Sequence, residues 1–125
     1  MSSAVSGIRQ VAITVSDVDK ALAFYQGILG LEFLFAPNAG LAFVQAGEIR
    51  IMLSTPQGAG KVGANSIMYF SVDDIENTFN EFVSNGAQAE RSPALAAQMP
   101  DHELWIGFLK DPDGNLVALI EEKRP

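Results

Sequence analysis

A strand-to-helix pattern that occurs twice constrains the fold of this chain more than any other feature of its sequence. Residues 10–17 read Gln-Val-Ala-Ile-Thr-Val-Ser-Asp, and residues 67–74 read Ile-Met-Tyr-Phe-Ser-Val-Asp-Asp. Each copy is a short stretch of strand character that runs directly into a segment with apolar residues at helical spacing. The chain is therefore predicted to contain two copies of one structural module.

Both copies continue into an amphipathic helix, predicted over residues 17–29 and 74–85. A polar residue suited to capping stands at the start of each helix, Ser16 in the first and Asp73 in the second. One face of each helix is apolar and is expected to be buried. The residues of these two faces are Val18, Ala21, Leu22, Tyr25, Ile28 and Leu29 in the first helix and Ile75, Thr78, Phe79, Phe82 and Val83 in the second.

Three segments of strand character follow each helix. They are residues 31–36, 41–46 and 48–54 in the first copy and residues 88–91, 104–109 and 115–121 in the second. Residues 92–101 are expected to form a mobile loop. Residues 111–115, Asp-Pro-Asp-Gly-Asn, are interpreted as a tight hairpin turn rather than a catalytic pair of carboxylates. The predicted fold class is α+β, with tandem βαβββ modules related by an internal pseudo-twofold axis.

The length of the chain limits how these modules are organised. With 125 residues, 48% of them hydrophobic, the chain can form one compact domain but not two independent ones. The predicted single domain, residues 1–125, has a first module over 8–54, a linker over 55–65 and a second module over 66–121. The linker is rich in Gly and Pro and has no hydrophobic period.

Composition limits the location and the partners of the protein. Cysteine is absent, which excludes disulfides, thiolate nucleophiles and cysteine metal sites, and a cytoplasmic location is expected. Neither export nor membrane insertion is expected, because no stretch approaches the roughly 18 apolar residues of a spanning helix. A net charge of −7 with scattered basic residues argues against nucleic acid as a partner. A cationic or neutral small molecule is the expected partner instead.

Motifs spread over roughly residues 8–121 carry a family resemblance. They are residues 11–17, the pair Phe24-Tyr25 ahead of Leu29-Gly30-Leu31, and residues 108–115. Together they resemble the vicinal oxygen chelate superfamily, which includes glyoxalase I, bleomycin-resistance proteins and extradiol dioxygenases. The resemblance implies that the two modules form a curved mixed sheet with a ligand cavity on its concave side. It also implies a homodimer with its cavities at or near the subunit interface.

The same resemblance implies where a metal would bind. Metal-dependent relatives have their ligands, usually His or Gln, Glu, His and Glu, at the positions that correspond to Gln10, Met52, Ile67 and Ala118. Among these four side chains, only that of Gln10 offers a hard donor atom. A divalent ion that acts as a Lewis acid needs about three nitrogen or oxygen ligands from the protein. The prediction is therefore that the cavity has no metal site and that the protein uses no cofactor.

Alternation along the strands predicts which residues face the cavity. The predicted ligand-binding residues are Gln10, Thr14, Arg50, Met52, Ile67, Tyr69, Trp105 and Ala118. Phe33, Phe35 or Phe43 join them, depending on the register of the strands. Two interpretations of Arg50 remain open: it is paired with a carboxylate, or it is available to an anionic or carbonyl group of a ligand.

His102 is the single histidine and the only candidate catalytic residue. It lies between Asp101 and Glu103, and its pKa range suits a general base, although a surface loop histidine is the alternative interpretation.

Two hypotheses about function follow from these residues. The favoured one is a metal-independent binding protein, similar to the bleomycin-resistance branch, that holds an aromatic, cationic or neutral ligand without changing it. The alternative is a glyoxalase-like lyase or isomerase, or a dioxygenase, with a non-canonical metal site or with His102 as the base.

Overall fold

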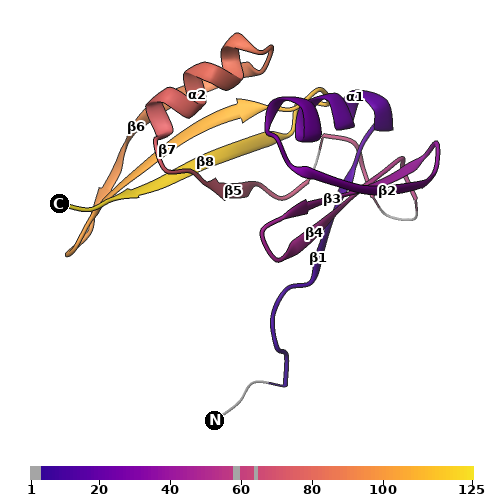
Figure 1. The fold of residues 1–125 in the computed structure, drawn as a ribbon, viewed down its shortest axis with the longest axis horizontal. Helices are drawn as coiled ribbons and strands as arrows, with labels where there is room; N and C mark the ends of the chain where they lie inside the picture. Colours follow the sequence, from indigo (N-terminus) through magenta and orange to yellow (C-terminus); the bar gives the residue numbers. More distant parts are fainter. Residues whose placement is uncertain (1–3, 58–59, 64) are drawn as a thin grey trace. The chain divides into compact units, whose positions relative to one another are not determined.

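The chain divides into two compact units, Met1–Val62 and Gly63–Pro125. The computed structural model describes residues 4–57, 60–63 and 65–125 (Figure 1). The division falls inside the predicted linker, of which Gly58, Ala59 and Ala64 lie outside the described residues. Each unit contains strands, helical segments and one mixed sheet, so the α+β class and the tandem βαβββ modules are confirmed.

Unit 1 is the first βαβββ module. Its elements are β1 (Gln10–Thr14), α1 (Val18–Leu22), η1 (Ala23–Ile28), β2 (Glu32–Asn38), β3 (Leu41–Ala46) and β4 (Ile49–Ser54). The strand order is β1-β4-β3-β2, with β1 parallel to β4 and the other pairs antiparallel. The helix predicted over residues 17–29 is present, and its second half, η1, is π-helical.

Unit 2 repeats the same connections. Its elements are β5 (Met68–Ser71), α2 (Ile75–Ser84), β6 (Gln88–Gln98), β7 (Glu103–Lys110) and β8 (Leu116–Lys123). The strand order is β5-β8-β7-β6, again with one parallel pair, β5 and β8. Within the described residues the eight strands are therefore hydrogen-bonded as two four-stranded sheets, one in each unit, rather than as one continuous sheet.

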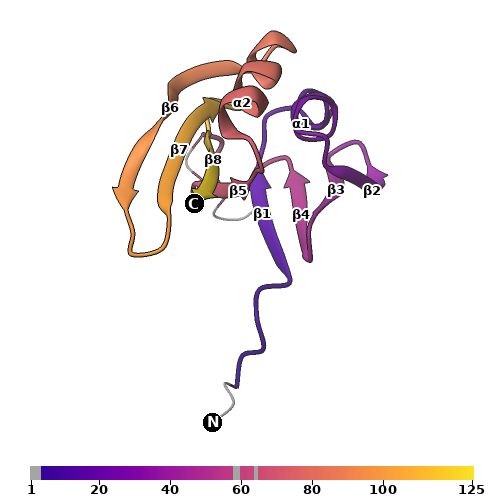
Figure 2. The same ribbon diagram turned by 60° about the vertical axis from the view of Figure 1, so that its left-hand side comes forward.

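Residues 92–101, expected to be a loop, mostly belong to a strand. β6 runs for 11 residues to Gln98 at the edge of the unit 2 sheet, beside β7 (Figure 2). Its register shifts three times against β7, and it contains Pro93. Such irregularities interrupt the two-residue alternation that identifies a strand in a sequence, and an edge strand tolerates them because one side needs no partner.

Both helices begin one residue later than predicted. Asp17, not Ser16, caps α1, and one of its carboxylate oxygens accepts a hydrogen bond from the Lys20 backbone nitrogen at 3.0 Å. Asp74, not Asp73, caps α2. A capping side chain must reach the backbone nitrogen three residues further on, and the tertiary position of the strand end decides which of two adjacent polar residues does so.

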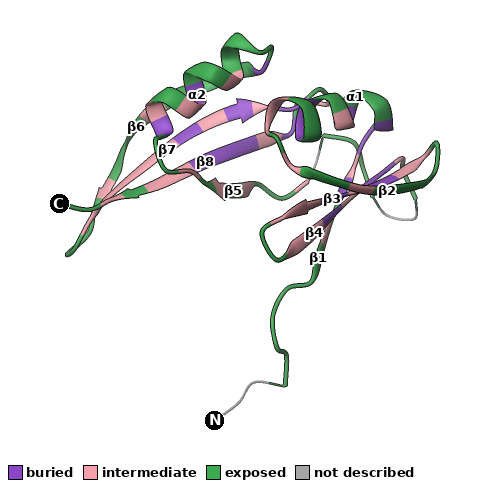
Figure 3. Cartoon of the chain, viewed as in Figure 1, coloured by how far each residue is buried: buried purple, intermediate pink, exposed green. Residues whose placement is uncertain are grey.

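The core of each unit lies between its helical segment and one face of its sheet. Buried residues line the strands and the inner sides of the helices, whereas the outer side of α2 is exposed (Figure 3). The buried apolar residues of these cores are Ile13, Val15, Val18, Ala21, Phe24, Tyr25, Ala42, Val44, Ile51 and Leu53 in unit 1 and Ile75, Phe79, Ala87, Leu109, Val117 and Leu119 in unit 2. Ala118 of β8 is also buried, but the register places it on the other face of its sheet. Each sheet therefore has a helix-covered face and an opposite face, which we call its open face.

The turn between β7 and β8 has the predicted structural role. Oδ1 of the buried Asp111 accepts hydrogen bonds from the backbone nitrogens of Asp113 and Asn115, at 2.9 and 2.8 Å. Gly114 adopts a φ of 84°, a conformation that favours glycine. The carboxylate of Asp111 therefore stabilises the turn from a buried position.

No helix in the described part of the chain has the length and apolarity needed to cross a bilayer.

Candidate functional site

The open face of unit 1 brings together four of the predicted binding residues. Gln10 lies beside Arg50 in the register of β1 and β4, Met52 lies between Ala12 and Phe43, and Thr14 lies beside Ser54. The intervening residues of the same strands, such as Ile13 and Ile51, are buried under the helical segment. Gln10, Thr14, Arg50 and Met52 thus share one face, as alternation predicted.

A bulge in β2 adds an aromatic residue to this face. Phe33 pairs with Val44, whereas Phe35, two residues later, pairs with Phe43, so that one extra residue of β2 lies between these two pairs. The shift places Phe35 on the open face, where its ring stacks on that of Phe43 with a centroid distance of 4.7 Å. Sequence alternation alone left the choice among these three phenylalanines open.

Polar and aromatic groups of this face contact one another. Nε of Arg50 donates a hydrogen bond to Oε1 of Gln10 at 2.7 Å, and the guanidinium lies 5.6 Å from the centroid of the Phe43 ring. Nε2 of Gln10 lies 3.8 Å from the sulfur of Met52. We call the five residues Gln10, Phe35, Phe43, Arg50 and Met52 the Arg50 cluster.

The residues present do not fit the metal site of metal-dependent relatives. The side-chain oxygen of Gln10 already accepts a hydrogen bond from Arg50, whose positive charge also opposes a cation. The thioether of Met52 is a soft and neutral ligand. No group of three or more His, Asp or Glu side chains in the described ranges is suited to hold a metal ion.

The open face of unit 2 carries a second aromatic group. Tyr69 and Phe108 flank the buried Ala118 in the register of β5, β8 and β7, and their rings meet edge to face at 6.2 Å. The guanidinium of Arg91, from β6, lies 5.6 Å from the centroid of the Phe108 ring. The sequence analysis did not predict this contact. Ile67 precedes β5 and is exposed.

Trp105 does not belong to this open face, so the expectation that it lies with Tyr69 is wrong. Trp105 pairs with Glu121, whose carboxylate accepts a hydrogen bond from the Ile75 backbone nitrogen at the start of α2. Paired residues of neighbouring strands point to the same side, so Trp105 lies on the helix-covered face. Lys123 lies over its ring, 4.4 Å from the centroid, and also pairs with Glu76 of α2.

His102 lies in a charged cluster at the other end of β7. Its Nδ1 is 2.7 Å from a carboxylate oxygen of Asp101, and its Nε2 is 3.9 Å from one of Glu122. Arg124 pairs with both acids, and its hydrogen bond, followed by that of His102, lowers the pKa of Asp101. The His102 side chain is only 12% exposed and borders a hollow of about 320 Å³.

The position of His102 separates it from the aromatic group of its own unit. Phe108 is six positions after His102 along an extended chain, a distance of about 20 Å at about 3.3 Å per residue. A ligand at Phe108 and Tyr69 would therefore have to be long to reach the imidazole.

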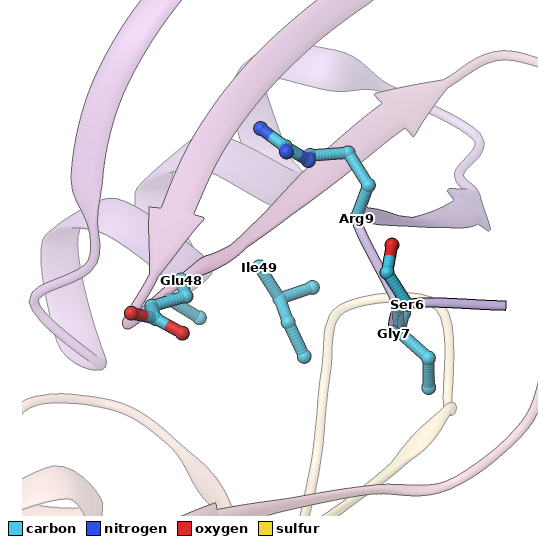
Figure 4. Close-up of a pocket in the computed structure, with 7 residues that line it drawn as sticks. Ser6, Gly7, Arg9, Glu48 and Ile49 are labelled. Carbon is cyan, nitrogen blue, oxygen red and sulfur yellow. The ribbon is translucent and has the colours of Figure 1, made fainter. Parts of the chain in front are cut away.

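A further hollow, of about 830 Å³, lies between the chain ahead of β1 and the β3–β4 turn. Figure 4 shows the side chains of Arg9, Glu48 and Ile49 around it. Its lining contains none of the predicted binding residues.

The fold defines a class of protein built from two βαβββ modules, each with one mixed four-stranded sheet. The family model of the Glyoxalase/Bleomycin resistance protein/Dioxygenase superfamily matches residues 7–119, and the chain belongs to this superfamily.

Relatives with assigned names are similar over most of the chain. A probable lactoylglutathione lyase from Synechocystis sp. is 31% identical over 87% of this chain and 90% of its own length. Another, from Vibrio cholerae, is 29% identical over 94% of this chain and 91% of its own length. A solved structure from Sphaerobacter thermophilus, described as a member of the same superfamily, is 26% identical with a TM-score of 0.75, covering 94% of this chain and 98% of its own.

Proposed function

We propose that this protein binds a small aromatic molecule reversibly and without a metal or a cofactor. The observation that carries the proposal is the Arg50 cluster, in which the residue at a metal-ligand position, Gln10, holds an arginine instead. The stacked rings of Phe35 and Phe43 offer a flat apolar surface beside these polar groups. Thr14 and Ser54 extend the same face.

The open face of unit 2 is proposed to contact a ligand as well. On this face, Ile67, Tyr69 and Ala118, which were predicted to face the cavity, are proposed to contact a ligand together with Phe108. The net charge of −7 favours a cationic or neutral molecule at long range. We further propose that the protein acts in the cytoplasm as a homodimer.

A second candidate function is catalysis of the glyoxalase type. The names of the two relatives, probable lactoylglutathione lyases, point to a lyase, and an isomerase or a dioxygenase would use the same fold. The observation in its favour is the contact between Asp101 and the mostly buried His102, because a carboxylate that orients an imidazole is a common arrangement for a general base.

A thermal-shift screen followed by mass spectrometry separates the two candidates. Aromatic compounds that bind only the folded protein should stabilise it by about 2.7 kcal/mol at a hundredfold their Kd and should be recovered unchanged. Phe43→Leu should remove most of the shift, whereas the matched control Phe33→Leu, which alters a residue in register with Val44, should retain it.

The opposite result would replace the binding proposal with the catalytic one. If a compound is converted to a product, and His102→Ala stops the conversion while the thermal shift persists, the protein is an enzyme. Trp105→Leu should leave ligand binding intact, because this side chain contacts Lys123 on the helix-covered face.

A further inference from the structure

We infer that the Arg50 cluster selects aromatic molecules that carry a carboxylate, with the guanidinium of Arg50 as the anchor of that group. The inference rests on the proposed function, because it names the ligand class of the same surface.

The guanidinium of Arg50 has N–H donors beyond the one that Gln10 uses. Its Nε is used by Gln10, but in the described part of the chain no carboxylate forms an ion pair with it. Glu32 is in the same row of the sheet, but Gln45 separates the two residues, so they lie two strand spacings, or about 10 Å, apart. Arg50 is half-buried, so its charge is partly desolvated without being neutralised.

Together, the polar groups of the cluster offer a ligand more donors than acceptors. Oε1 of Gln10 already receives the Arg50 hydrogen bond, and the amide nitrogen of Gln10 faces a sulfur, which is a weak acceptor. The polar groups of the cluster therefore offer donors to a ligand. A carboxylate satisfies donors of this kind best, because the planar guanidinium matches its two oxygens.

The aromatic part of the ligand has a place beside this anchor. Phe35 is 49% exposed, although its ring stacks on Phe43, and the guanidinium lies over the Phe43 ring. A flat ring can cover the exposed part of Phe35 while its carboxylate reaches Arg50. The hydrogen bond to Gln10 holds the guanidinium in place before the ligand arrives, which lowers the entropy lost on binding.

The net charge of −7 does not oppose this preference at contact distance. Charges farther apart than the Debye length of about 8 Å at physiological salt are largely screened, whereas the Arg50 guanidinium would touch the ligand. A cationic ligand at the same place would meet a positive charge directly. Local charge therefore decides the class of ligand, and the net charge acts on the approach.

Three probes of one shape test the inference: naphthalene-2-carboxylate, naphthalene-2-carboxamide and naphthalen-2-ylmethylammonium. Their affinities for the full chain are measured by calorimetry at low and high salt, and ¹H–¹⁵N NMR follows the Nε–H signal of Arg50 and the amide signals of Gln10. We expect the carboxylate to bind at least about tenfold more tightly than the amide, and the ammonium to bind most weakly. Added salt should weaken the binding of the carboxylate probe but not that of the other two probes.

Variants assign the preference to Arg50. Arg50→Gln should remove the advantage of the carboxylate over the amide, and Arg50→Lys should retain only part of it because the forked geometry is lost. Arg9→Gln removes the same charge from an exposed position one residue before β1 and should leave the preference unchanged. Backbone NMR spectra show whether each variant is folded.

Each outcome decides between the inference and the function on which it rests. If carboxylate and amide bind equally, or if Arg50→Gln and Arg50→Lys both keep the preference, the inference is wrong and aromatic binding stands. If none of the three probes binds at millimolar concentration, the inference and the proposed function both fail. Conversion of a bound probe to a product overturns the proposed function alone.

Discussion

At the scale of single residues, the direction of a side chain has more consequence for function than its identity. Arg50 was recognised from the sequence as either paired or available, and the structure shows it bound to Gln10 and lying over Phe43. Trp105 has a large aromatic side chain of the kind that often contacts ligands. It lies instead on the helix-covered face of its sheet, where it contacts Lys123. The position of each residue in the register therefore separates the proposed binding residues from the packing residues.

Gly107 offers a prediction about packing in unit 2. A Cβ atom at this position would lie 3.1 Å from Cγ of Pro93 and 3.2 Å from Cδ2 of Phe79. We expect Gly107→Ala to lower the free energy of unfolding by about 1–3 kcal/mol, because neither ring can move away easily.

The matched control is Gly27→Ala in η1. A Cβ at Gly27 meets no atom within 4 Å, so the substitution should raise the free energy of unfolding by about 0.5–1 kcal/mol. Urea denaturation measures both variants, and equal stability of Gly107→Ala and the wild type would contradict the packing argument.

The pair formed by Glu76 and Lys123 predicts a pH dependence. The hydrogen bond from Lys123 is the main cause that holds the pKa of Glu76 below its ordinary value of 4.5. A carboxyl group with a lowered pKa in the folded state stabilises the protein above its unfolded pKa and loses this effect as the pH falls through the folded value. The stabilisation is therefore complete at neutral pH and disappears in acid.

Melting temperatures across pH test this pair. We expect Glu76→Gln to melt slightly below the wild type at pH 7, since both side chains are partly exposed, and the difference should vanish as the pH falls below 4.5. The double variant Glu76→Gln/Lys123→Met should lose less stability than the sum of the losses in the two single variants. A difference that persists unchanged in acid would show that the ion pair is not its cause.

At the scale of elements, the two modules keep one topology although their strands differ in regularity. β2 and β6 are the outer antiparallel strands of their sheets, and both contain register shifts. The shift in β2 carries Phe35 to the open face beside Phe43. An irregular edge strand thus adds a side chain to the candidate site without altering the strands that hold Gln10 and Arg50.

The start of α2 allows a matched test of helix capping. The Asp74 carboxylate accepts hydrogen bonds from the backbone nitrogen and the side-chain amide of Asn77, at 3.3 and 2.7 Å. We expect Asp74→Ala to cost about 1 kcal/mol of unfolding free energy. Asp73→Ala, one residue earlier, should change stability by less than half as much. Equal losses in the two variants, measured by thermal unfolding, would mean that charge near the helix start matters rather than the cap.

At the scale of the whole molecule, membership of the superfamily does not imply the metal chemistry of its metal-dependent members. Three of the four implied ligand positions hold Met52, Ile67 and Ala118, and the fourth, Gln10, is bonded to Arg50. Purified protein should therefore contain less than one equivalent of Zn, Ni, Mn or Fe by elemental analysis. EDTA should leave its melting temperature unchanged, and a large decrease would show that a metal is bound after all.

The homodimer is a second prediction for the whole molecule. Exposed apolar side chains, among them Phe33, Tyr69 and Leu95, lie on the surface of the single chain. A stable dimer would bury well over about 1,000 Å² of such surface. Light scattering at micromolar concentration should give twice the mass of 13.4 kDa, and a monomer would contradict the prediction.

The sequence by itself determined the module, its duplication and the alternation of β1 and β4. These features depend on local periodicity and on short motifs, because a strand or a helix must bury one face wherever it lies. The same local rules placed Gln10, Thr14, Arg50 and Met52 on one face, as the register confirms.

Only the tertiary structure decided the caps, the length of β6, the side of Trp105 and the contribution of Phe35. Each depends on pairing between residues that are distant in sequence, and a shift of one residue moves a side chain to the other face of a sheet. The hydrogen bond from Arg50 to Gln10 joins two strands 40 residues apart in the sequence, and no local pattern predicts it. The fold was thus readable from local periodicity, whereas the chemistry of the site followed from the register.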